Sequence, residues 1–123
     1  MTTLEEVKKT VADFVRAGDT NDVTLLEQVL HTHFQNVQDG FFEENGVFIF
    51  SKEDYKTLVK TKRFGGAARK IEFGQIDISG KIAHVKVRLE SNFLIFNSIL
   101  LLGYEDKRWT IIHNIPKIEK KGQ

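Results

Sequence analysis

Residues 82–104, IAHVKVRLESNFLIFNSILLLGY, contain two apolar segments whose side chains alternate in different ways. In the first segment, residues 82–90, every second side chain is polar, which predicts a strand with one buried face and one hydrated face. The second segment, residues 93–104, is apolar at both sets of alternating positions, which predicts a strand that is covered on both faces. Ser91 and Asn92 separate the segments and predict a turn. We therefore expect neighbouring antiparallel strands inside a sheet.

The apolar side chains of the second strand predict a partner for the sheet. They are Ile95, Ile99 and Leu101 on one face and Leu94, Phe96, Leu100 and Leu102 on the other. One face can pack on helices of the same chain, but a chain of 123 residues has little left to cover the other. At about 25 cal/mol per Å² of apolar surface, burying several such side chains is strongly favourable. We therefore expect a homodimer through the outer face of the sheet.

Hydrophobic spacing predicts two helices at the start of the chain. Apolar residues at steps of three and four indicate a helix over residues 3–17, which Gly18 can end. The same spacing indicates a short helix within residues 21–30, capped by Asn21 or Asp22. These helices come before every predicted strand.

Residues 31–39 alternate and predict a strand, which must bulge or twist because Phe34 and Val37 cannot share a face. Asp39 and Gly40 then predict a turn. The remaining predicted elements are a strand within residues 45–50, a helix capped by Ser51, a loop over residues 63–69, and strands over residues 70–80, 81–91, 92–106 and 107–118. The fold class is α+β, in a single domain over residues 1–123, with helices packed on a mostly antiparallel sheet.

The composition narrows the classes of partner and location. Eighteen basic and seventeen acidic side chains leave a net charge of +1, so no nucleic-acid surface is expected. The chain has no cysteine, which excludes disulfides, thiolate metal sites and cysteine nucleophiles and suits the cytoplasm. The longest mostly apolar run, residues 93–104, is too short to span a bilayer, and the N-terminus lacks the apolar centre of a signal peptide. We expect a cytoplasmic protein without a membrane partner.

Three stretches together resemble a known superfamily. They are VADFVRAGDTNDVTLLEQVLH at residues 11–31, IDISGKIAHVKVRLE at residues 76–90, and LLLGYEDKRWTIIHNI at residues 100–115. Their order is similar to the nuclear transport factor 2-like superfamily, and most similar to its SnoaL-like small proteins of unknown function labelled "putative lumazine-binding". The resemblance implies a cone-shaped fold in which N-terminal helices pack on a strongly curved sheet and enclose a pocket. It implies no single activity, because this scaffold carries isomerases, cyclases, dehydratases, transport adaptors and association domains.

The ketosteroid isomerase branch of this superfamily differs from the chain at its catalytic positions. Phe14 stands where that branch carries a tyrosine hydroxyl, and Ile99 or Leu100 stands about where it carries a protonated aspartate. Because the loss of one such donor typically costs about 10²- to 10³-fold in rate, the resemblance argues against ketosteroid isomerisation. Asp39 lies within about one residue of the position of that branch's base.

His31 and His33 are candidates for a metal or an acid–base role. The related small proteins usually read His-Pro-Asp-Ala where this chain reads HTHF, so His31 matches and His33 replaces an acidic residue. A zinc or iron site needs at least a third ligand, which His84, His113 or Asp39 would supply only through folding. We therefore expect neither a metal nor a cofactor. The catalytic candidates are Asp39, His113 and His33, with Asp39 as a base or as the group that orients His113.

A mostly apolar pocket between helices and sheet is expected to bind a small hydrophobic or aromatic ligand. The residues predicted to line it are Phe14, His31, Phe34, Tyr55 and Trp109. Strand alternation places Trp109, Ile111 and His113 on one face and Asn114 on the other, so His113 and Asn114 cannot both line the pocket. The basic stretch KTKRFGGAARK, residues 60–70, could hold an anion through side chains that include Arg63 and Arg69. It is interpreted as a mobile turn instead, because no helix start follows its glycines.

The sequence leaves three functions open. The first is a small-molecule-binding dimer with an apolar pocket. The second is an enzyme of the cyclase, dehydratase or isomerase type that uses Asp39 and a histidine. The third is a dimerisation module without catalytic activity, whose pocket is filled by phenylalanines. Whether the chain is an enzyme is left undecided by its residues.

Overall fold

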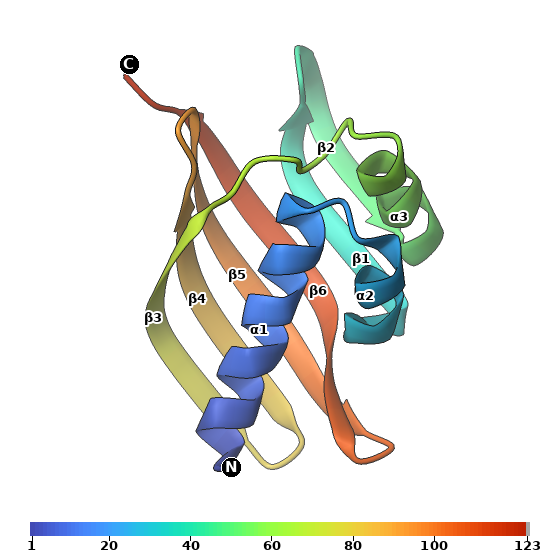
Figure 1. The fold of residues 1–123 in the computed structure, drawn as a ribbon, viewed down its shortest axis with the longest axis vertical. Coiled ribbons are helices and arrows are strands. Elements are labelled where there is room, and N and C mark those ends of the chain that lie inside the picture. Colours follow the sequence, from blue (N-terminus) through green and yellow to red (C-terminus); the bar gives the residue numbers. More distant parts are fainter. Residues whose placement is uncertain (123) are drawn as a thin grey trace.

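The computed structural model describes residues 1–122, which form three helices and a six-stranded sheet (Figure 1). The elements are α1 (Thr3–Asp19), α2 (Val23–Val29), β1 (Leu30–Phe41), β2 (Glu44–Ser51), α3 (Lys52–Lys60), β3 (Lys70–Ser79), β4 (Ile82–Glu90), β5 (Leu94–Glu105) and β6 (Arg108–Lys120). The strands lie in the order β2-β1-β6-β5-β4-β3, and only β1 and β6 pair in parallel. Figure 1 shows the helices over one face of the curved sheet, here called the inner face. The predicted α+β class with a curved, mostly antiparallel sheet is confirmed.

Each helix begins at a side chain that caps its first amides. A threonine–glutamate capping box starts α1, and Asp22 and Ser51 accept backbone hydrogen bonds at the starts of α2 and α3. Gly18 does not end α1, which continues to Asp19; Asn21 takes the left-handed conformation instead, with a φ of 52°. The three predicted helices are confirmed. Over residues 1–122, none of the helices has the combination of length and apolar character needed to cross a membrane.

The core lies between the helices and the inner face of the sheet. Val7, Val11 and Leu26 have no exposed surface. The alternating set predicted to be buried on β4, Ala83, Val85, Val87 and Leu89, is at most 4% exposed. On β5 the inward side chains include Leu100 and Leu102, while Ile99 and Leu101 face outward and are partly exposed. The sequence therefore predicted correctly that β4 has one wet face and that β5 has two apolar faces.

The turn between β1 and β2 lies further along the chain than predicted. Asp39 and Gly40 both belong to β1, and the turn is at Phe42 and Glu43. Gly40 has a φ of 84° next to a register shift between β1 and β2. The glycine therefore serves a bulge rather than the hairpin turn.

β1 contains an irregularity, as predicted, but it does not lie between Phe34 and Val37, the two residues from which it was predicted. Phe34 is buried on the inner face, and Val37 points outward, opposite Ile49 of β2. The pairing of β1 with β6 shifts between Leu30 and Gln35. The segment from Phe34 to Val37 alternates regularly, so the bend precedes it.

β6 contains a bulge that reverses the side-chain faces along the strand. Ile111 and His113 pair with consecutive residues of β5, which leaves Ile112 without a partner there. Ile111 and Asn114 face inward and are 0% and 6% exposed, whereas His113 faces outward. The predicted shared face of Trp109, Ile111 and His113 is therefore wrong. Trp109 and Ile111 share the inner face with Asn114.

Candidate functional site

A cavity of about 410 Å³, here called the inner cavity, lies between the helices and the inner face of the sheet. The ladder between β1 and β6 ends at Asn36 opposite Asn114, and beyond these residues the strands diverge (Figure 1). Pro116 follows on β6 and has no N–H to continue a ladder. The exposed residues Phe42 and Lys120 belong to the lining, so the cavity opens to solvent between the diverging segments.

Aromatic rings form much of the apolar wall. Phe14 of α1 stacks on Tyr55 of α3 with ring centroids 6.1 Å apart, and Tyr55 lies 5.7 Å from Phe64. Phe34 lies 5.2 Å from Tyr55 on the side of the core and is 1% exposed. The wall therefore offers flat apolar surfaces of the kind that planar ligands contact.

Arg69 brings a guanidinium to the cavity wall. Its Nε donates to Asp19 Oδ1 at 2.6 Å, and its backbone N–H donates to Asp19 Oδ2 at 3.0 Å. The guanidinium lies 4.9 Å from the centre of the Phe96 ring. Asn21 adds hydrogen bonds from its side chain to the carbonyls of Val59 and Phe64. The basic turn interpreted as mobile is thus anchored to the end of α1.

Tyr55 supplies a neutral hydroxyl. Burial raises the pKa of this hydroxyl above its usual value; the nearby Arg69 acts in the opposite direction, and Asp19 acts in the same direction. The phenol is therefore protonated at neutral pH. A protonated phenol can both donate and accept a hydrogen bond.

Three buried amides form a continuous hydrogen-bonded chain under the cavity. Asn114 Nδ2 donates to Asn36 Oδ1 at 2.7 Å, Asn36 Nδ2 donates to Gln38 Oε1 at 2.7 Å, and Gln38 Nε2 donates to the Gly40 carbonyl at 3.0 Å. The three side chains belong to residues that are 6%, 1% and 7% exposed. Here this set is called the amide chain. It is the main polar feature of the sheet side of the cavity.

The structure brings together only part of the predicted ligand-binding set. Phe14 and Tyr55 line the inner cavity, and Phe34 packs behind them. His31 is elsewhere, with Nε2 2.9 Å from Glu105 Oε1. Trp109 is 6% exposed and packs on Tyr104, near the turn between β5 and β6. These last two residues do not belong to the cavity lining.

The catalytic candidates do not meet. Asp39 is exposed at the rim of the inner cavity, His33 is exposed, and His113 faces outward. His113 pairs with Gln35, four residues before Asp39 on β1, which corresponds to about 13 Å along the strand. Within residues 1–122, no hydrogen bond or ion pair joins Asp39 to a histidine.

His31 has both ring nitrogens occupied. Its Nδ1 accepts the backbone N–H of His33 at 3.0 Å, so its Nε2 carries the proton that faces Glu105. In the part of the chain that the structure describes, no cluster of three or more histidine, cysteine or acidic residues is placed to hold a metal ion. The spacing of the two histidines allows the side chain of His31 to accept a hydrogen bond from the backbone of His33.

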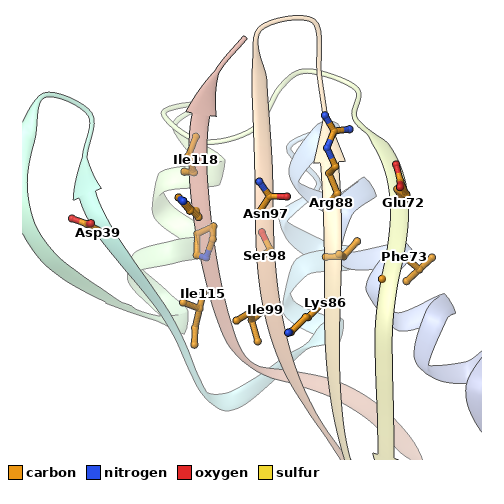
Figure 2. A pocket seen from close by; sticks show the side chains of 14 residues that line it. Asp39, Glu72, Phe73, Lys86, Arg88, Asn97, Ser98, Ile99, Ile115 and Ile118 are labelled. Carbon is orange, nitrogen blue, oxygen red and sulfur yellow. The ribbon is translucent and has the colours of Figure 1, made fainter. Parts of the chain in front are cut away.

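A second hollow, of about 750 Å³, lies on the outer face of the sheet (Figure 2). Figure 2 shows Ile115, Ile99 and Lys86 side by side on β6, β5 and β4, as their pairing requires. Ile115 is 43% exposed. Asp39 and Glu72 add acidic groups at two sides of this hollow. The outer face is thus apolar at its centre and charged around it.

Sequence reasoning did not assign Arg69 or the three members of the amide chain to the pocket. Asn36 and Gln38 had a usable signal, because they follow Phe34 at every second position and so share its inward face. Asn114 was predicted correctly to face away from His113 but was not assigned to the pocket. Arg69 was noted only as one basic residue of a turn, and its place at the cavity wall involves a contact with Asp19, fifty residues away, that the sequence did not indicate.

Comparisons with known proteins identify the family and similar folds. Residues 2–115 match the model of a family described as "Putative lumazine-binding". No curated protein sequence matches the chain. The matched residues contain all three helices, strands β1 to β5 and the first part of β6.

Several solved structures are similar to this one. An NTF2-like protein of unknown function from Silicibacter pomeroyi has a TM-score of 0.82 and 18% identity, over 97% of this chain and 100% of that chain. One from Shewanella baltica has a TM-score of 0.79 and 15% identity, over 97% and 98% of the two chains. A ketosteroid isomerase-like protein from Erwinia carotovora has a TM-score of 0.76 and 11% identity, over 98% and 97%. At these identities the likeness concerns the fold alone.

Proposed function

Because the chain belongs to the family described as putative lumazine-binding and has the nuclear transport factor 2-like fold that its sequence resembles, we propose that it binds a flat, mostly apolar small molecule in the inner cavity. The cavity itself carries the proposal. Its volume of about 410 Å³ lies within the range of roughly 300–1,000 Å³ that is typical of small-molecule sites. Aromatic rings with a few polar groups between them suit a planar ligand.

The alternatives gain less support from the geometry. A dimerisation module with a vestigial pocket would have its phenylalanines filling the cavity, whereas Phe14 and Phe64 line open space. An enzyme acting through Asp39 and a histidine would need the two groups close together, and His113 and His33 lie elsewhere. The proposal includes a cytoplasmic location, which the cysteine-free sequence supports.

Titration calorimetry with lumazine tests the proposal. Ala67 is exposed and lines the cavity, while its neighbour Ala68 is equally exposed and does not. Ala67→Trp places a large ring in the cavity without disturbing the core, and Ala68→Trp is the matched control. We expect lumazine to bind the wild-type protein and the Ala68→Trp variant with equal affinity, and to bind Ala67→Trp at least tenfold more weakly.

Comparison of the two tryptophan variants shows whether lumazine binds in the inner cavity or at another site. Lumazine binding that Ala67→Trp leaves unchanged would place the ligand outside the inner cavity. Absence of heat with the wild-type protein would remove lumazine as a ligand and count against the proposed function.

We further propose that two copies of the chain associate through the outer face. Ile115 of β6 pairs with Ile99 of β5, and Val37 of β1 pairs with Ile49 of β2; these two apolar pairs on the outer face are here called the apolar row. Ile49 and Ile115 are 59% and 43% exposed in the single chain. Contact with the same surface of a second copy would remove these side chains from water. Acidic and basic residues around the row give each copy charges of both signs to pair.

Sedimentation equilibrium tests the dimer. The expected mass is twice the 14.1 kDa of one chain. Ile115→Lys places a charge in the row and should produce monomers. Leu4→Lys is the control, since Leu4 is 44% exposed on α1, which lies over the inner face of the sheet and not the outer face. A wild-type protein that sediments as a single chain would overturn this part of the proposal.

A further inference from the structure

We propose that the inner cavity selects ligands carrying an N–H group that donates to Oδ1 of Asn114, an inference that rests on the ligand binding proposed above. A side-chain amide can present either its oxygen or its nitrogen to a ligand. In this fold the hydrogen bonds of the amide chain fix which atom of Asn114 faces the ligand. The carbonyl of Gly40, at the far end of the amide chain, sets the direction of these hydrogen bonds.

The polarity of the amide chain follows from that carbonyl. A backbone carbonyl only accepts hydrogen bonds, so Gln38 must turn Nε2 towards Gly40, at 3.0 Å. Gln38 Oε1 then faces Asn36 and accepts from its Nδ2, which turns Asn36 Oδ1 towards Asn114. Asn114 can satisfy that oxygen only with Nδ2. Reversing any one amide would bring two oxygens or two N–H groups together at 2.7 Å.

The remaining oxygen of Asn114 is open to the cavity. No backbone or side-chain donor within residues 1–122 bonds to Oδ1, although Asn114 is only 6% exposed and lines the cavity. Every fully buried side-chain nitrogen or oxygen in the same residues has a partner. Oδ1 must therefore retain accessible surface, and the cavity is where the residue meets open space. A purely apolar ligand that covered this acceptor would leave it unpaired, which costs affinity.

A complementary donor lies on another wall. Arg69 directs Nε to Asp19 and Nη2 to the carbonyl of Val15, while its Nη1 has no hydrogen-bond partner within residues 1–122. Asp19 balances the positive charge of Arg69, so the ligand needs an acceptor such as a carbonyl rather than a full negative charge. An acceptor and a donor between aromatic rings select a planar heterocycle with lactam or imide groups. Lumazine has this chemistry.

Methylation of the ligand's N–H groups tests the inference. Calorimetry compares lumazine with 1,3-dimethyllumazine, which keeps the ring and the carbonyls but lacks these N–H groups. The wild-type protein should bind lumazine about tenfold more tightly, as expected for one hydrogen bond to a buried acceptor. Asn114→Leu should remove this preference. Ala68→Trp leaves the amide chain intact and should keep the preference, and the comparison of the two compounds with the wild-type protein decides the inference even if the leucine variant folds poorly.

The outcomes separate this inference from the proposed function. If the wild-type protein binds both compounds equally, or if Asn114→Leu keeps the preference for lumazine, the assignment of Asn114 is overturned while ligand binding stands. If neither compound binds, both proposals are overturned. A preference present in the wild-type protein and in Ala68→Trp, and absent in Asn114→Leu, supports the assignment.

Discussion

Substituting Asp19 by Asn is expected to lower the free energy of unfolding by about 3 kcal/mol, because it leaves the Arg69 guanidinium without its anionic partner. The two side chains are only 11% and 13% exposed, and Arg69 Nε lies 2.6 Å from Asp19 Oδ1. Removing one partner of a buried ion pair typically costs roughly 3–5 kcal/mol. The remaining exposure of both groups places this pair at the lower end of that range.

Urea unfolding followed by circular dichroism measures these free energies. Arg69→Met keeps most of the aliphatic stem and removes the charge, so the double variant with Asp19→Asn should lose clearly less than the sum of the single losses. Asp13→Asn is the control: Asp13 pairs with the exposed Lys9 and Arg16 on α1, and its substitution should cost less than about 1 kcal/mol. Losses that add in the double variant would refute the view that this ion pair anchors the turn.

Two further predictions concern the glycines and the acid stability. Gly65→Ala should destabilise the protein by more than about 2 kcal/mol, because a Cβ would lie 2.1 Å from the Gly18 carbonyl oxygen; Gly80→Ala, with open space around it, should cost only about 1–2 kcal/mol for its positive φ. Two lysines of α3 lower the pKa of Glu27 from 4.5 to about 2. The stability that this carboxylate contributes is therefore complete above pH 4.5 and lost as the pH falls towards 2. Glu27→Gln should weaken the pH dependence of thermal unfolding in that window.

The sequence predicted best those elements whose structure depends on neighbouring residues in the chain. The caps at Asp22 and Ser51 and the alternation along residues 82–90 act locally, so the helices and β4 could be predicted. The outward apolar positions of β5 were predicted for the same reason. Their role in a dimer is still a prediction.

The bulges could not be located from the sequence. Ile111 and Ile112 are both isoleucine, so an extra residue between two apolar positions leaves no trace in the alternation. Asp39 and Gly40 have the composition of a hairpin turn, yet the chain uses Phe42 and Glu43 for the turn and Gly40 for an irregularity in β1. The pairing between strands determines where the bulges and the turn lie, and the turn propensity of single residues does not.

The candidate site was predictable on its aromatic side only. Phe14 and Tyr55 lie on apolar helix faces that must point towards the sheet, so their place at the cavity followed from helix spacing. The amide chain depends on the polarity of hydrogen bonds between strands, and Arg69 depends on a distant aspartate. Contacts of this kind exist only in the folded chain.

A crystal structure of the protein grown with lumazine would test the central claim most directly, because it would show both the location and the orientation of the ligand. The account predicts the ring system in the inner cavity, with a ring nitrogen within about 2.7–3.2 Å of Asn114 Oδ1. Lumazine seated on the outer face, or in the inner cavity with no nitrogen near that oxygen, would contradict it.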